Sequence, residues 1–338
     1  NIIEGPWGGG NKFFKNFHKY FEHKGIEVIN HLADNDIDLI VLTDPRKSSL
    51  SGSFTHKEIN LYKKNINPNV YVIQRINECD QRKKTQGVNE FYIKSNKIAD
   101  HTVFVSRWLY DVYKKDGFEA DYSVILGGGD SDLFKNISNK EWDKKKKFKI
   151  VSHHWSDNYM KGLNLYKQLD QIISSTELGN KIEVTFIGNF TNKENFKNIN
   201  FLEPLSGTEL VEKLNNNNAY ITGSLNEPSG NHHIEAAQCG LPILYQNSGG
   251  IPEYCNGFGI DYNLDNLENK IYELMENHDT YLVKMKDYQL NNNDMFLKYE
   301  NLITNIRKTK TKRKKSNIVF FFFIYKKLIN KIKLKIFI

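Results

Sequence analysis

Two glutamates flank a short segment whose composition fits a ligand site. Residues 223–242 read GSLNEPSGNHHIEAAQCGLP and place Glu227 and Glu235 eight positions apart. An apolar run precedes Glu227, while Asn231 and Glu235 are spaced to share one face of a helix. Backbone N–H groups at a helix N-terminus bind anions, and ionised carboxylates accept hydrogen bonds from hydroxyl groups. The segment therefore predicts a site for a diphosphate with hydroxyls on both sides, as in a nucleotide sugar. The alternative is a surface loop with two solvated acids.

Residue types in the same segment predict where its helix begins and ends. The Pro-Ser-Gly of residues 228–230 predicts a turn. Ser229 or Asn231 can cap the helix, which we expect to stop at the Gly-Leu-Pro of residues 240–242. The turn and the first helical residues would then present their backbone to a ligand.

Short apolar runs alternate with longer amphipathic stretches along the chain. The pattern predicts strands at residues 1–5, 26–30, 38–44, 70–76, 101–106, 122–126, 149–155, 182–189, 219–224 and 241–246. It predicts helices at residues 11–25, 107–117, 160–173, 207–216 and 232–239. Strands that alternate with helices form parallel sheets covered on both faces. We therefore expect an α/β fold with two doubly wound, Rossmann-like domains that face each other across a cleft.

The polar, cationic segment 139–148 is the predicted linker between these domains. We expect an N-terminal domain at residues 1–145, a C-terminal domain at residues 146–290, and a terminal helix with a basic and apolar tail at residues 291–338. In doubly wound folds, ligands bind at the carboxyl ends of strands where the strand order reverses.

Three glycines follow the first predicted strand. Gly8, Gly9 and Gly10 would let the backbone approach an anion at the start of the next helix. The alternative is a plain tight turn. The dinucleotide-binding fingerprint is not met, because Phe13 stands where its third glycine would fall.

A dense group of charged residues follows the strand predicted at residues 70–76. Arg75, Glu78, Asp80 and Arg82 all lie within VIQRINECDQRKK. Glu78 or Asp80 could serve as a base or hold an acceptor. The alternative is a surface network of arginines and acids.

The net charge of +7 is concentrated at the end of this chain of 338 residues. Residues 307–338 contain 12 Lys or Arg and no Asp or Glu, so residues 1–306 carry 35 basic and 40 acidic side chains. A mildly acidic body excludes a nucleic-acid-binding domain, which would have a basic face. Three scattered cysteines predict reduced thiols in a cytoplasmic protein.

The basic tail combines charge with apolar residues. Its apolar run, residues 318–325, is too short to span a bilayer. Lysines that interleave with apolar residues predict peripheral contact between residues 307–338 and an anionic membrane surface. The alternatives are a terminal helix that packs back onto the N-terminal domain and a tail without fixed structure.

Two pairs of adjacent histidines, at residues 153–154 and 232–233, raise the question of a metal site. Neighbouring residues point in different directions, so each pair offers at most one convenient ligand. No spacing matches a zinc motif, and we predict that the protein needs no metal and no cofactor.

The quoted segments resemble family 4 glycosyltransferases, which are retaining group 1 enzymes with the GT-B fold. EPSGNHHIE is similar to that family's Glu-x7-Glu motif, and GLPILYQNSGGIPEYCNGFGI resembles the segment that follows it. ADHTVFVSRWLYDVY, ILGGGDSDLF and KIVSHHWSDNYMKG resemble earlier segments in the family's order. The resemblance covers roughly residues 1–290 and implies sugar transfer from a nucleoside diphosphate sugar.

The resemblance also implies roles for single residues. Glu235 would bind the ribose hydroxyls, Glu227 would face the donor sugar, and Lys161 would neutralise the diphosphate as catalytic cation. The backbone of Ser229, Gly230 and Asn231 would contact the sugar and phosphate. Gly9 and Gly10 would approach the phosphates from the other domain, and His153 would line the donor site.

Two positions depart from the family pattern. Ser156 stands where the family usually has an arginine before the lysine, and His153 is a poor replacement for a permanent cation. The histidine usual after one N-terminal strand is also missing, and the charged group with Glu78 takes its place. From the resemblance as a whole, we expect a hexosyltransferase-type enzyme that acts on a glycan, lipid-linked or protein acceptor. The alternatives are a non-catalytic sugar-nucleotide-binding or scaffolding subunit and a nucleotide-sugar epimerase.

Overall fold

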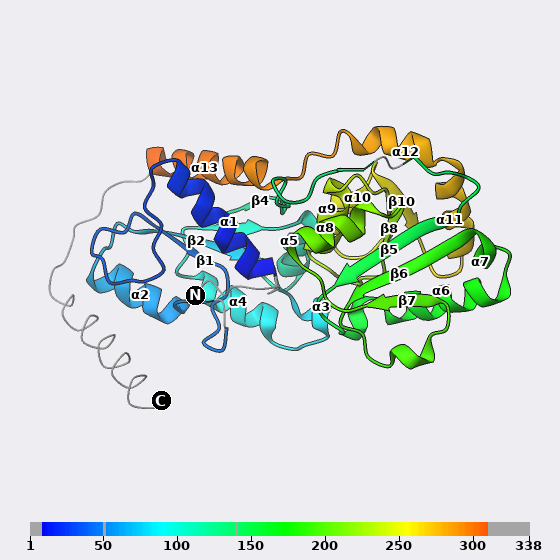
Figure 1. Cartoon of the computed structure of the whole chain (residues 1–338). Helices are drawn as coiled ribbons and strands as arrows, with labels where there is room; N and C mark the ends of the chain where they lie inside the picture. Colours follow the sequence, from blue (N-terminus) through cyan, green and yellow to red (C-terminus); the bar gives the residue numbers. More distant parts are fainter. Residues whose placement is uncertain (1–8, 50–51, 139–140, 310–338) are drawn as a thin grey trace, which may run out of the picture.

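Two parallel β-sheets organise the part of the chain that the computed structural model describes, residues 9–49, 52–138 and 141–309 (Figure 1). One sheet lies within residues 39–124 and the other within residues 148–262, with helices between the strands. The expected α/β fold with two Rossmann-like units is confirmed. The strand predicted at residues 1–5 and the tail beyond residue 309 lie outside the described residues.

The N-terminal sheet has four parallel strands in the order β1-β2-β3-β4. They are β1 (Leu39–Leu42), β2 (Tyr71–Ile76), β3 (His101–Phe104) and β4 (Tyr122–Val124). The helices of this unit are α1 (Gly9–His23), α2 (His56–Asn65), α3 (Asp80–Lys83), α4 (Val88–Asn96) and α5 (Arg107–Lys115). Short, apolar, largely buried strands of this kind are typical of a sheet with both faces covered.

The C-terminal sheet has six parallel strands in the order β10-β9-β8-β5-β6-β7. They are β5 (Phe148–His154), β6 (Ile182–Gly188), β7 (Ile199–Leu202), β8 (Ala219–Thr222), β9 (Ile243–Gln246) and β10 (Gly259–Tyr262). The helices are α6 (Leu163–Ser175), α7 (Leu178–Lys181), α8 (Gly207–Asn215), α9 (Asn231–Gln238), α10 (Ile251–Cys255), α11 (Leu267–Glu276) and α12 (His278–Met285), with 3-10 turns η1 (Tyr159–Lys161) and η2 (Lys193–Asn195). The strand order reverses between β5 and β8, so the carboxyl ends of these two strands are where a ligand is expected.

A long helix, α13 (Asn292–Thr309), returns from the C-terminal unit and lies beside α1 on the N-terminal unit (Figure 1). Phe13, Phe17 and Phe21 of α1 recur every four residues, so they share one face of the helix and are buried. They pack against Phe296 and Tyr299 of α13, with ring centroids 5.7 Å apart for Phe13 and each partner. The end of the described chain therefore helps to form the core of the first unit.

Most predicted elements are confirmed, and two features differ. Residues 26–30 form no strand, and Ile26 is exposed. Apolar residues at alternate positions were therefore not enough to form a strand here, because no described strand pairs with this segment. Gly9 and Gly10 are not a free turn but the first two residues of α1.

The chain joins the second unit before the predicted linker. Phe134 packs in a core cluster of the C-terminal unit, and the Asn215 side-chain amide donates to the Lys135 carbonyl over 3.0 Å. The domain boundary at residue 145 stays a prediction. Within the described residues, no helix combines the length and apolar character needed to cross a membrane.

Gly162 allows the β5–α6 connection to lie directly on the end of β8. Its φ is +109°, and a Cβ atom there would lie 2.7 Å from the Gly223 Cα. The backbone N–H of Leu225 also donates to the Met160 carbonyl, over 2.8 Å. This close approach brings the turn that carries Lys161 against the segment that leads to Glu227.

We predict that Gly162→Ala lowers the free energy of unfolding by about 3 kcal/mol, because it combines an unfavourable φ with a backbone clash. Gly117→Ala is the matched control, since Gly117 has a φ of +91° and open space around it. The control should cost only about 1–2 kcal/mol. Urea unfolding followed by circular dichroism measures both, and equal losses would contradict the packing explanation.

Candidate functional site

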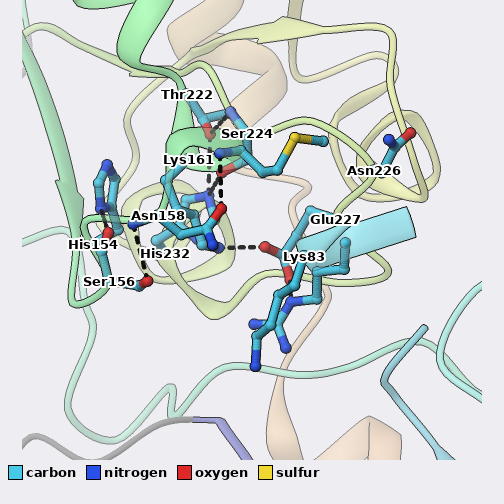
Figure 2. A network of polar contacts seen from close by, with 12 residues as sticks. Lys83, His154, Ser156, Asn158, Lys161, Thr222, Ser224, Asn226, Glu227 and His232 are labelled. Atoms are coloured by element: carbon cyan, nitrogen blue, oxygen red, sulfur yellow. Dashed lines mark hydrogen bonds and ion pairs between the residues drawn. The ribbon is translucent and has the colours of Figure 1, made fainter. Parts of the chain in front are cut away.

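The candidate site lies at the carboxyl ends of β5 and β8, where the strand order reverses (Figure 2). Lys161 comes from the turn after β5, and Glu227 comes from the loop after β8. Their side chains meet in an ion pair, and His232 lies behind them against Thr222 and Ser224 (Figure 2). The fold thus brings together two of the residues expected to act on a donor.

Glu227 is held by cations from both units. Its carboxylate pairs with Lys161 of the C-terminal unit and lies 3.1 Å from the Arg82 Nε of the N-terminal unit. The Arg82 contact is an ion pair without hydrogen-bond alignment. Glu227 is only 4% exposed, so its charge depends on these two partners.

The loop around Glu227 is fixed by a second loop at residues 248–250. The Asn226 N–H donates to the Ser248 hydroxyl over 2.9 Å, and the Gly250 N–H donates to the Glu227 carbonyl over 2.9 Å. Gly249 has a φ of +68°, and a Cβ atom there would lie 2.5 Å from the Glu227 backbone N and O. The Ser-Gly-Gly of residues 248–250 therefore sets the position of Glu227.

The charges around Glu227 determine its protonation. Burial alone would raise the pKa of this carboxyl group, but Arg82 and Lys161 outweigh burial and lower its pKa to about 2. Glu227 is therefore ionised near neutral pH. An ionised carboxylate beside a lysine can orient hydroxyl groups, and it cannot donate a proton.

Glu235, on α9, is the second buried carboxylate. Its Oε1 lies 2.6 Å from the Lys12 Nζ of α1, and its Oε2 lies 3.1 Å from the His153 Nε2 at the end of β5. Burial alone would raise the pKa of Glu235, but Lys12 and His153 together outweigh burial, so the pKa is lowered. Like Glu227, Glu235 is held by one residue from each unit.

The start of α9 lies between the two carboxylates in the sequence. Gly230 is the residue before the helix, with a φ of +92° and no side-chain cap, and Asn231 is the first helical residue. The prediction that Ser229 or Asn231 caps this helix is therefore wrong. The first N–H groups of a helix have no partner within it, and Ser229, Gly230 and Asn231 are partly exposed. This backbone remains suited to an anionic ligand.

The charged segment after β2 reaches the same site. The Glu78 Oε2 lies 3.2 Å from both the Arg82 Nη1 and the Lys83 Nζ, and the Tyr113 hydroxyl donates to the Glu78 carbonyl over 3.0 Å. Glu78 is 7% exposed, so this is a buried network rather than a surface network. In the structure Glu78 contacts Arg82, which in turn contacts Glu227.

Asp80 has a structural role at the start of α4. Its two carboxylate oxygens accept hydrogen bonds from the N–H groups of Val88 and Asn89, both over 3.0 Å. These bonds lower the pKa of Asp80, although burial alone would raise it. An acid with both oxygens committed to a helix start is not available as a base, so that alternative is set aside.

His154, His232 and His233 are neutral near the site, because burial lowers the pKa of each. Burial is the main cause that lowers the pKa values of His154 and His233 to about 3. The His154 Nδ1 donates to the Ser156 carbonyl over 2.6 Å, and the His232 Nε2 lies 3.0 Å from the Thr222 hydroxyl. Across residues 9–49, 52–138 and 141–309, no group of three or more His, Cys, Asp or Glu is placed to hold a metal ion.

A cavity of about 270 Å³ opens beside Lys161 on the α6 side of the C-terminal sheet. Its lining includes His154, Lys161, Tyr166, Phe190 and Phe196. The cavity does not include Glu227 or Glu235, whose carboxylates are covered by side chains of the N-terminal unit.

Further contacts join the units beside the site. The Glu253 carboxylate of α10 accepts hydrogen bonds from the N–H groups of Arg107 and Trp108, over 2.7 and 2.8 Å, at the start of α5. The Tyr254 hydroxyl accepts from the Gly127 N–H over 2.9 Å and donates to the Val105 carbonyl. The two units are therefore joined by hydrogen bonds as well as by the ion pairs of Glu227 and Glu235.

Sequence reasoning found both carboxylates and Lys161 but missed two partners. Lys12 lies two residues after Gly10, so its place beside a predicted anion-binding turn was the available signal. Arg82 was part of the charged segment but had no assigned role. Gly9 and Gly10 lie at the start of the helix that carries Lys12 to Glu235.

Known proteins are similar to this chain in sequence and in fold. Residues 134–292 match the family model described as glycosyl transferases group 1. HepE from Anabaena in complex with UDP is similar in structure, with a TM-score of 0.67 and 14% identity over 89% of this chain and 98% of that chain. Sucrose-phosphate synthase from Thermosynechococcus elongatus has a TM-score of 0.62 and 16% identity over 91% and 83% of the two chains. A glycosyltransferase from Rickettsia africae has a TM-score of 0.57 and 13% identity over 91% and 85%.

No curated protein matches the chain. The chain has the GT-B fold, and residues 134–292 are similar to the glycosyl transferases of group 1.

We predict that the free energy of unfolding falls as the pH drops from 6.5 to 5, and that His233→Leu reduces this fall by about 2 kcal/mol. The folded-state pKa of His233 is about 3, so the unfolded chain takes up a proton first as the pH falls below 6.5. The stability that neutral His233 contributes is therefore lost from pH 6.5 downward. Urea unfolding at several pH values measures the slope, and an unchanged slope in the variant would contradict the neutral, buried state.

Proposed function

We propose that this protein is a retaining glycosyltransferase that transfers a hexose from a nucleoside diphosphate donor to an acceptor hydroxyl. The observation that carries the proposal is the placement of Glu227 and Glu235. Both carboxylates are ionised at the point where the strand order reverses, on either side of the uncapped start of α9. Lys161, a cation suited to a diphosphate, lies against one of them.

Each group has a proposed role in donor binding. The diphosphate lies between Lys161 and the first N–H groups of α9, because both favour negative charge. Glu235 accepts hydrogen bonds from the ribose hydroxyls, and Glu227 accepts them from the sugar hydroxyls. The backbone at Ser229 and Gly230 completes the phosphate contacts.

The proposed reaction breaks the bond between the anomeric carbon and the diphosphate oxygen. A bond from the acceptor oxygen to the same carbon forms on the same face of the sugar. The acceptor proton passes to the leaving diphosphate, so the products are the glycoside and the nucleoside diphosphate. Lys161 stabilises the charge that develops on the leaving oxygen, and such preorganised cations contribute strongly to rate.

Arg82 is the proposed second cation of the donor site. Ser156, the expected place of an arginine in related sequences, has no cationic side chain and uses its carbonyl to bind His154. Arg82 approaches Glu227 from the N-terminal unit instead, on the same carboxylate as Lys161. Glu78 holds Arg82 in this position, which makes Glu78 a positioning residue in the proposal.

Similar structures support a uridine diphosphate donor. HepE from Anabaena was solved in complex with UDP-glucose, and the pneumococcal O-GlcNAc transferase GtfA was solved in complex with UDP and GlcNAc. We extend this donor class to the present chain. Membrane contact by residues 307–338 and a lipid-linked acceptor stay predictions, because nearly all of this segment lies outside the described residues.

We predict that UDP release from a panel of UDP-hexoses falls by about 100-fold or more in Glu227→Gln and Lys161→Met. Lys193→Met is the matched control, because Lys193 pairs with Glu203 on the surface of the same unit. A UDP-release assay with water or a simple sugar as acceptor measures the rates, and NMR of the product reports its anomeric configuration. Chelation by EDTA should leave the rate unchanged, since the proposal needs no metal.

Three outcomes would contradict parts of this proposal. Donor binding without release or transfer would favour a non-catalytic sugar-nucleotide-binding subunit, which the absence of a cation at Ser156 also favours. An epimerised sugar without acceptor would indicate an epimerase. Loss of activity with EDTA, restored by a divalent metal, would show that a metal takes part.

A further inference from the structure

Arg75 is a buried cation on β2 whose charge has no carboxylate partner in the described part of the chain. Its side chain is 6% exposed, and its guanidinium carbon lies 4.2 Å from the centroid of the Phe13 ring on α1. The Nε and Nη1 atoms are buried and make no hydrogen bond with any described residue. Burying a charge without a partner is costly, and the stacking on Phe13 offsets only part of that cost.

A second unpartnered donor lies beside Arg75. The Tyr299 hydroxyl of α13 is buried and likewise has no hydrogen-bond partner among the described residues. Burial raises the pKa of Tyr299 to about 12 while the nearby Arg75 charge opposes that rise, so the hydroxyl is protonated near neutral pH. The guanidinium and the hydroxyl together offer several N–H and O–H donors to one place.

Neighbouring acids are committed elsewhere. Asp44, which follows β1, pairs with Arg46 over 2.7 Å. Glu78, which follows β2, pairs with Arg82 and Lys83. Since the Arg75 Nε, the Arg75 Nη1 and the Tyr299 hydroxyl have no hydrogen-bond partner among the described residues, an oxyanion from outside the chain suits them.

We propose that Arg75 and Tyr299 form a binding site for an oxyanion, a phosphate or carboxylate group, carried by the acceptor. The site is built from β2, α1 and α13, all on the N-terminal unit, and Arg75 lies one short turn before the Glu78–Arg82 network that reaches Glu227. Assignment of the oxyanion to an acceptor rests on the proposed function. The site itself does not, because the donors are unpartnered whatever reaction occurs.

Inorganic phosphate is the probe, and thermal stabilisation is the measurement. The melting temperature of the wild-type protein should be higher in phosphate than in chloride at equal ionic strength. Arg75→Met should raise the apparent Kd for phosphate by about tenfold or more, and Tyr299→Phe should raise it less. Without phosphate, Arg75→Met should melt no lower than wild type, because an unpaired buried charge is removed.

Two controls separate this site from the donor site. Arg107 also stacks on an aromatic ring, that of Tyr110, but it is exposed and paired with Asp111, so Arg107→Met should leave phosphate binding unchanged. Lys161→Met separates the two sites, because it removes phosphate bound at the proposed donor site and leaves phosphate bound at Arg75, so the effect of Arg75→Met should persist in the double variant. UDP-glucose should stabilise Arg75→Met as much as it stabilises wild type. If UDP-glucose stabilises neither protein, the proposed donor is wrong, but the phosphate measurement still tests the Arg75 site.

The opposite pattern would overturn the site. Equal phosphate stabilisation of wild type and Arg75→Met would mean an adventitious ion only. Loss of phosphate binding in Lys161→Met with retention in Arg75→Met would place phosphate in the donor site. If Arg75→Met does not fold, the comparison of Tyr299→Phe with wild type decides, and unchanged phosphate binding in that variant overturns the proposal.

Discussion

Two buried carboxylates at the seam between the units are the constraint on which the rest of the structure depends. Burying either carboxylate without a partner would be costly, and each one contacts one residue of the N-terminal unit and one residue of the C-terminal unit. Lys161 and Arg82 hold Glu227, while His153 and Lys12 hold Glu235. The two carboxylates that suit a nucleotide sugar therefore also form the ion pairs that join the N-terminal unit to the C-terminal unit.

This arrangement implies how ligand binding and domain contact are coupled. A donor that uses both carboxylates must take over hydrogen bonds that Lys12 and Arg82 now satisfy. Lys12 is partly exposed, with 43% of its side chain accessible, whereas Arg82 is further fixed by Glu78. We therefore expect the α1 side to release Glu235 more readily. The contacts of Glu253 and Tyr254 with the N-terminal unit do not involve these pairs and can serve as the pivot.

Local sequence patterns predicted much of the fold and half of the site. Hydrophobic periodicity located most strands and helices, and the spacing of Glu227 and Glu235 located the two carboxylates that the fold buries between the units. The partners Lys12 and Arg82 are 223 and 145 positions away from the acids they hold, and no local pattern encodes such pairings. The start of α9 was also missed in detail, because a left-handed Gly230 replaced the side-chain cap that composition favoured. At residues 26–30, an alternating pattern was present but no neighbouring strand was available to pair with it.

The most direct test of the donor site is calorimetric titration of UDP and UDP-glucose into wild type and Glu235→Ala. If Glu235 binds the ribose, wild type should bind both ligands and the variant should lose about tenfold or more in affinity, because buried carboxylate hydrogen bonds are lost. Binding of UDP alone should weaken as much as binding of UDP-glucose, since the ribose is common to both. Equal affinity in wild type and variant, or no binding of either nucleotide to wild type, would contradict the assignment of this seam as a nucleotide-sugar site.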